Sequence, residues 1–157
     1  MKYFLLWLLL VAVISSTRGQ VNQSALINNP DFGRAVAKSV RFPAVAQRLG
    51  KSIRVYVGFT LTDKGGYQDI AVINQNPIDE SLKLEVDRLW HVLPDQNPKC
   101  AGNYVIPISF MLGEGGPNKL KQISNQDDKF IKQGDYTLLK EVSVIGYIEC
   151  ELRSLSN

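Results

Sequence analysis

Cysteine and histidine are scarce in this sequence, which limits the chemistry that it can support. The chain has two cysteines and one histidine in 157 residues, fewer side chains than the usual four-ligand structural zinc site needs. No serine or cysteine lies in a nucleophile motif, and no glycine-rich phosphate loop follows an expected strand. His91 is expected to face solvent at the end of a helix. We therefore expect no metal site, no cofactor, no catalytic residues and no enzymatic activity.

A dominant charge of one sign is also absent. Lysine and arginine number 18 against 15 aspartate and glutamate residues, a net charge of +3. Lys2 and Arg18 fall in the first 19 positions, which leaves 16 basic against 15 acidic residues, or +1, for the rest. A nearly neutral chain without a basic cluster is not expected to bind nucleic acid. The composition gives no indication of a small-molecule substrate either.

The apolar run at the start of the chain is too short to span a membrane. It extends from Tyr3 to Ile14, whereas a spanning helix needs roughly 20 apolar residues. The positive Lys2 precedes the run and a short polar stretch ending at Gly19 follows it, which is the pattern of a signal peptide. We expect residues 1–19 to be cleaved near Gly19 and the protein to be exported, with an uncleaved anchor as the alternative.

Export bears on the two cysteines, because an oxidising compartment favours a disulfide. An intrachain bridge between Cys100 and Cys150 would stabilise the fold by about 4 kcal/mol in the chain-entropy model. Two free thiols, or an intermolecular bridge, are the alternatives.

Local patterns divide the rest of the chain into three segments. Residues 20–41 form a polar N-terminal segment with a short helix, for which Asn29 is the expected N-cap. Residues 42–113 hold the main domain. Residues 114–157 hold a linker and then a C-terminal strand or tail, with its apolar run from Leu138 to Ile148.

The main domain contains a predicted hairpin followed by a helix. Ile53 to Leu61 alternates apolar and polar side chains, which indicates a strand with one buried face. A turn at residues 63–66 leads into a returning strand. Pro77 to Leu93 predicts a helix with Asp79 as its N-cap. The apolar stripe of this helix consists of Leu82, Val86, Leu89 and Leu93.

The last strand of the domain, Tyr104 to Leu112, contains Pro107. Proline has no amide hydrogen to donate to a ladder, so a strand that holds it belongs at a sheet edge. An edge strand exposes backbone groups with which another strand can pair. This edge is therefore either an aggregation hazard or a binding site.

The ordered set of patterns resembles the C-terminal domain of TonB, the energy transducer of Gram-negative bacteria. The resemblance covers nearly half of the chain. The matching residues are Phe42-Pro43 with Gly50, Val55 to Leu61, Gly65, Val72, Pro77-Ile78-Asp79, Glu85 to Leu89, and Ile106 to Phe110.

This resemblance implies an α+β fold of αββαβ order, with a small antiparallel sheet and helices packed on one face. In the family the last strand lies at the edge and captures a short extended segment, the TonB box, of an outer-membrane receptor. Carried onto this sequence, the partner-binding strand consists of Tyr104, Val105, Ile106, Pro107, Ile108, Ser109 and Phe110.

The function that the resemblance implies is a periplasmic module that binds a protein segment by strand addition and is linked to TonB-dependent outer-membrane transport. The expected uncleaved membrane helix and proline-rich spacer of TonB proteins are not seen here, which puts energy transduction in doubt. The alternative is an exported interaction domain whose edge is closed by its own tail. That alternative predicts no peptide binding until the tail after Gly113 is deleted.

The tail itself is similar to many receptor TonB boxes, which read Glu-Val-x-Val-x-Gly-Tyr. The matching residues are Glu141, Val142, Val144, Gly146 and Tyr147. An ordinary strand is the other interpretation. The tail could pair with the strand that holds Pro107, within one molecule or between two copies. A bridge between Cys100 and Cys150 would require that pairing to be antiparallel. Receptor boxes, as the resemblance implies, add in parallel.

Overall fold

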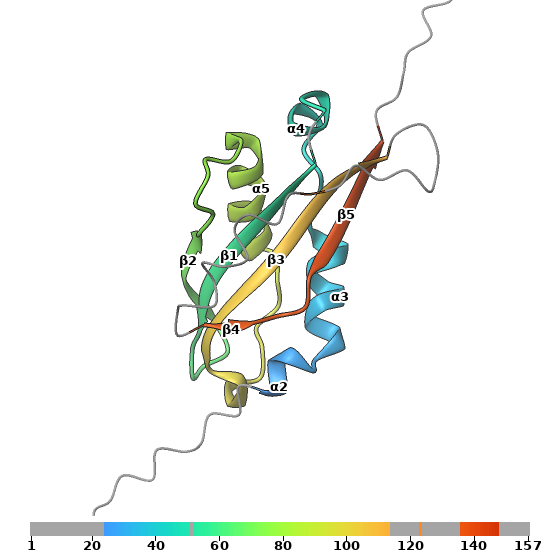
Figure 1. Ribbon diagram of the computed structural model, residues 1–157. Coiled ribbons are helices and arrows are strands. Elements are labelled where there is room, and N and C mark those ends of the chain that lie inside the picture. Colours follow the sequence, from blue (N-terminus) through green and yellow to red (C-terminus); the bar gives the residue numbers. More distant parts are fainter. Residues whose placement is uncertain (1–23, 51, 114–122, 124–135, 148–157) are drawn as a thin grey trace, which may run out of the picture.

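The structure is a computed structural model that describes residues 24–50, 52–113, 123 and 136–147 (Figure 1). The predicted signal peptide and Cys150 lie outside these residues. The helices are α2 (Ser24–Ile27), α3 (Pro30–Ser39), α4 (Ala44–Arg48), α5 (Glu80–Trp90) and the 3-10 turn η2 (Pro98–Cys100). The strands are β1 (Ile53–Leu61), β2 (Tyr67–Val72), β3 (Gly102–Gly113), β4 (Thr137–Leu138) and β5 (Val142–Tyr147). The fold is α+β, as the sequence predicts.

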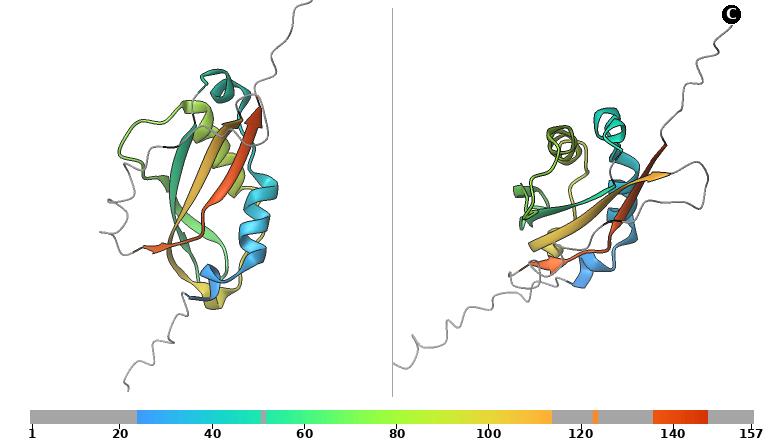
Figure 2. Two further views of the ribbon diagram at one scale, coloured as in Figure 1. Left: turned by 45° about the vertical axis from the view of Figure 1, so that its right-hand side comes forward. Right: turned by 45° about the horizontal axis from the view of Figure 1, so that its top comes forward.

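One sheet organises these strands. Its antiparallel part has the order β2–β1–β3, and β4 and β5 then lie along the other side of β3 (Figures 1 and 2). Both of these short strands run parallel to β3. The predicted antiparallel sheet is the β2–β1–β3 part, and the tail adds to it in parallel, which makes the whole sheet mixed. The C-terminal edge strand itself is present, so β3 has a neighbour on each side.

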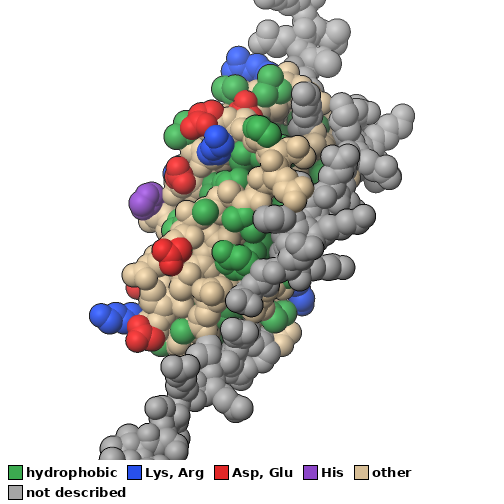
Figure 3. All heavy atoms as spheres, turned by 60° about the vertical axis from the view of Figure 1, so that its left-hand side comes forward, with side chains coloured by type: hydrophobic (Ala, Val, Ile, Leu, Met, Phe, Trp, Pro, Cys, Tyr) green, Lys and Arg blue, Asp and Glu red, His purple; other side chains and the backbone are tan. Residues whose placement is uncertain are grey.

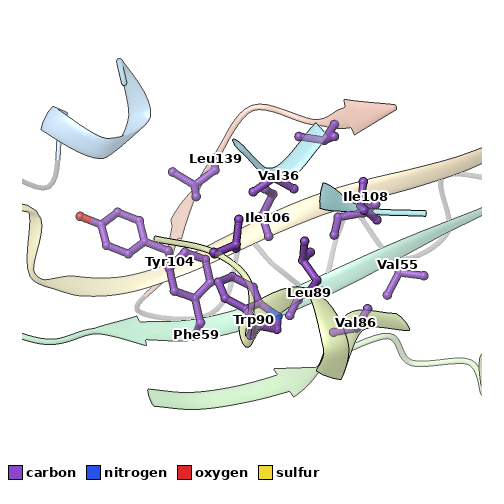
Figure 4. Packing of buried hydrophobic residues seen from close by; sticks show 14 of the residues in the cluster. Val36, Val55, Phe59, Val86, Leu89, Trp90, Tyr104, Ile106, Ile108 and Leu139 are labelled. Carbon is purple, nitrogen blue, oxygen red and sulfur yellow. The ribbon is translucent and has the colours of Figure 1, made fainter. Parts of the chain in front are cut away.

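The helices α3 and α5 cover one face of this sheet and enclose the hydrophobic core. Figure 4 shows Val36 of α3 and Leu89 of α5 directed at Ile106 of β3. Trp90 is buried beside Phe59, with ring centroids 4.6 Å apart. The tail contributes Leu139 to the same core. The packed unit therefore includes residues from all three segments of the chain.

The helix starts follow from the capping residues. Asn29 precedes Pro30 at the start of α3, and its side-chain oxygen accepts a hydrogen bond from the backbone N–H of Asp31 at 2.9 Å. Asp79 accepts in the same way from the N–H of Ser81 at 2.9 Å, at the start of α5. Each cap satisfies an amide that the first helical turn leaves without a partner, which confirms both predicted caps. None of the described helices is long and apolar enough to cross a membrane.

The outer edge of β2 is irregular. The pairing register between β1 and β2 shifts between Gly58 and Thr60, and Asp69 on β2 has a positive φ of 52°. A bulge and a charged side chain both oppose pairing with a further strand. The other long side of the sheet, along β3, is the one that accepts a strand.

Candidate strand-binding site

One backbone hydrogen bond shows which residues of β3 turn their backbone groups toward the tail. The N–H of Leu139 donates to the carbonyl of Val105 at 2.8 Å. Because backbone groups alternate in direction along a strand, Pro107 and Ser109 also turn their backbone toward the tail. Pro107 therefore faces the tail without an amide hydrogen to offer.

The tail passes this position with a bulge. Val105 pairs with Leu138, and Ile108 pairs with Val142, so β3 advances three positions while the tail advances four. The extra tail residue falls between these two pairs, along the stretch of β3 that holds Pro107. Beyond the bulge the parallel pairing is regular and runs from Ile108 with Val142 to Gly113 with Tyr147. The bulge thus lets one tail segment pair on both sides of the proline.

On the core face, the tail is held by apolar side chains. Leu139 is 6% exposed and Val142 is 7% exposed. Val144 packs against the same core. Burying each such side chain contributes roughly 1.5–3 kcal/mol, so the tail is bound by side chains as well as by its backbone.

On the opposite face, the tail is held by a carboxylate. Oε2 of Glu141 lies 2.9 Å from Nη2 of Arg54 on β1. The hydroxyl of Ser109 on β3 also donates to Oε1 of Glu141. The side chain of Arg54 is only 16% exposed, which makes this pair stronger than a fully solvated ion pair.

The far end of β5 fits closely against the segment that begins α4. A Cβ added at Gly146 would lie 2.8 Å from Cδ1 of Phe42 and 2.9 Å from Cδ of Gln47. The Phe42 ring is itself packed on Phe110, with centroids 5.3 Å apart. Only glycine therefore fits at this tail position without a shift of its neighbours.

The predicted site residues divide between the two strands and the two faces. All seven residues of the predicted partner-binding strand lie in β3. In the tail, Val142, Val144 and Gly146 lie on the core face, and Glu141 and Tyr147 lie on the other. The sequence reasoning did not find the roles of Arg54 and Phe42. The alternation of β1 places Arg54 on the polar face, but only the tertiary fold brings it to Glu141.

Cys100 is a buried free thiol, and its possible disulfide partner Cys150 lies outside the described residues. Tyr147 pairs with Gly113, at the end of β3 opposite to Cys100. The 12 residues of β3 span about 40 Å, whereas the three residues from Tyr147 to Cys150 reach at most about 11 Å. The parallel direction of the tail thus removes the geometry that a bridge requires.

The start of β3 is fixed by Tyr104. Its hydroxyl donates to the carbonyl of Cys100 at 2.5 Å. Burial raises the pKa of this phenol above its usual value. Tyr104 therefore acts as a buried structural donor at this end of the site.

These features describe an α+β domain whose antiparallel sheet is extended by an added parallel strand. Two solution structures of the Helicobacter pylori TonB C-terminal domain are similar to this chain. The longer is 25% identical, with a TM-score of 0.44, and covers 61% of this chain and 97% of its own. The shorter is 27% identical, with a TM-score of 0.39, and covers 50% of this chain and 87% of its own. No protein-family profile and no curated protein matches the sequence.

Proposed function

We propose that this protein is a binding module that captures an extended protein segment by parallel strand addition to β3. The observation that supports it best is the parallel register of β5 on β3, from Ile108 with Val142 to Gly113 with Tyr147. Backbone pairing provides affinity for any extended segment, and the side chains on the two faces provide selectivity. No step of this function calls for a catalytic group.

The proposed partner is a TonB-box-like segment of an outer-membrane receptor. Two observations support this choice. The tail that occupies β3 has the box-like sequence from Glu141 to Tyr147, and it pairs in the direction that the family resemblance implies for a receptor box. The signal-peptide pattern of residues 1–19 supports export to the periplasm, where such receptor segments are exposed.

A second function is favoured by the same pairing. The tail fills the side of β3 that a receptor segment would use, with Leu139 and Val142 buried in the core. In this second function the domain is an exported interaction module closed by its own tail, and no energy transduction takes place. The two functions differ in whether a foreign segment can displace the tail.

Peptide titration of the isotopically labelled full chain separates the two functions. The peptide has the sequence of residues 139–147, and the hosts are the wild type and Val142→Asp. A carboxylate at the buried Val142 position is costly to desolvate, so it should release the tail. Ser143→Asp adds the same charge at an exposed position of β5 and is the matched control.

Amide shifts from Val105 to Gly113 in the wild type would support capture of a receptor segment. Shifts in Val142→Asp alone would support the closed module. If neither protein responds, strand capture at β3 is wrong.

A further inference from the structure

Three side chains form a row across the sheet face that lies opposite the helices. Arg54 on β1 and Ser109 on β3 are cross-strand partners in the antiparallel register. Nε of Arg54 donates to Oγ of Ser109 at 3.1 Å, and Nη2 of Arg54 donates to Oε1 of Glu141 at 3.1 Å. Ser109 completes the row by donating to the same carboxylate.

Two of these side chains belong to β1 and β3 and not to the tail. Ser109 is fully buried, and its hydroxyl accepts from Arg54 while it donates to Glu141. The guanidinium fork of Arg54 is thereby oriented toward the position next to β3. Any strand that adds to β3 in the register of the tail would place a side chain on this pair.

We propose that Arg54 and Ser109 form a subsite that selects an acidic side chain in the strand bound to β3. This inference rests on the proposed function and specifies the ligand class. The preferred segment has an acidic residue directly before an apolar residue, as in Glu141-Val142. The acidic side chain reaches Arg54 on one face while the apolar one is buried on the other.

The subsite also sets the register of the bound strand. A slip by one residue would turn Val142 away from the core. A slip by two residues keeps the faces but brings Leu139 or Ser143 to the subsite, and neither carries a charge. The buried Ser109 and the guanidinium would then lose their carboxylate partner. The acidic residue therefore distinguishes registers that the backbone ladder alone does not.

Hydrogen exchange of the full chain tests the subsite while the chain's own tail is bound to β3. Glu141→Gln and Arg54→Gln should each accelerate exchange of the β5 amides about 10- to 100-fold, because a charge-assisted hydrogen bond is lost. The double variant should exchange less fast than the product of the two single effects, because each single variant already removes the contact between Arg54 and Glu141. Glu80→Gln, at an exposed pair with Lys83, is the matched control.

The subsite is refuted if the single variants exchange like Glu80→Gln, or if their effects multiply in the double variant. Exchange of the β1 and β2 amides reports whether the fold is intact. If Arg54→Gln does not fold, Arg54→Lys replaces it. Lysine keeps the charge but lacks the fork that contacts Ser109 and Glu141 together.

A second measurement tests the ligand preference in trans. Peptides with the sequence of residues 139–147, carrying Glu or Gln at the position of Glu141, are added to the full-length Val142→Asp chain. The Glu peptide should bind about 10- to 100-fold more tightly, and Arg54→Gln should abolish that preference. If the Glu and Gln peptides bind the Val142→Asp chain with equal affinity, the subsite is refuted. Absence of binding by both peptides refutes capture in trans, and the exchange experiment then decides the subsite alone.

Discussion

Substitution of Gly146 by alanine should weaken the hold on the tail while leaving the rest of the fold in place. The added Cβ would lie 2.8 Å from Phe42 and 2.9 Å from Gln47, both closer than carbon atoms pack without a shift. Gln47 is fixed in turn, because its Nε2 donates to the carbonyl of Phe42 at 2.8 Å. The end of β5 must therefore move away from α4.

The magnitude follows from the cost of overpacking. Insertion of one carbon into a filled site costs about 1–3 kcal/mol. At 1.4 kcal/mol per factor of ten, the closed state of the tail becomes about 5- to 150-fold less favoured. Because the tail is the outermost strand, we expect local opening of β5 and not global unfolding.

Native-state hydrogen exchange measures this opening directly. The amides of β5 should exchange about 5- to 150-fold faster in Gly146→Ala, while those of β1 stay protected. Gly33→Ala is the matched control, because a Cβ at Gly33 meets nothing within 4 Å. Exchange of β5 at the wild-type rate in Gly146→Ala would refute the close fit against Phe42.

Three further predictions concern the rest of the domain. Glu85 is 8% exposed, and its Oε1 lies 2.6 Å from Nη2 of Arg88. Because Glu85→Ala removes this buried partner, it should lower the free energy of unfolding, measured in urea, by about 1–3 kcal/mol. Burial raises the pKa of Tyr67 to about 12. The stability linked to its neutral phenol is therefore present below pH 10 and is lost as the pH rises toward 12. Urea unfolding of Tyr67→Phe across this pH range should not show that loss. Cys100 is buried and free, so it should resist alkylation until the protein unfolds, and mass spectrometry of the unreduced protein should show no Cys100–Cys150 bridge.

Local sequence signals were sufficient for most of the elements. The alternation from Ile53 to Leu61 gives the bounds of β1, and Asn29 and Asp79 mark the two helix starts. Gly50, which closely follows α4, has a positive φ of 66°, a conformation that glycine adopts readily. Each of these features depends on residues that are neighbours in the sequence, which is why the sequence alone can predict them.

The arrangement of the tail depends on contacts between distant residues, and here the sequence was a weaker guide. It predicted a C-terminal strand and its box-like residues, but not the strand direction on which the disulfide depends. The bulge between the β4 and β5 pairings and the contact of Glu141 with Arg54 join positions that no local periodicity connects. The helix α2 was also missed, although Leu26 is 2% exposed, because four helical residues give too short a pattern.

The most direct test of the central claim is the direction of a captured strand on β3. A peptide with the sequence of residues 139–147 carries a nitroxide at either end and is added to the labelled Val142→Asp chain. Parallel capture predicts that the C-terminal label broadens the amides near Gly113, and that the N-terminal label broadens those near Tyr104. The reversed pattern, or no selective broadening along β3, would contradict parallel strand capture at β3.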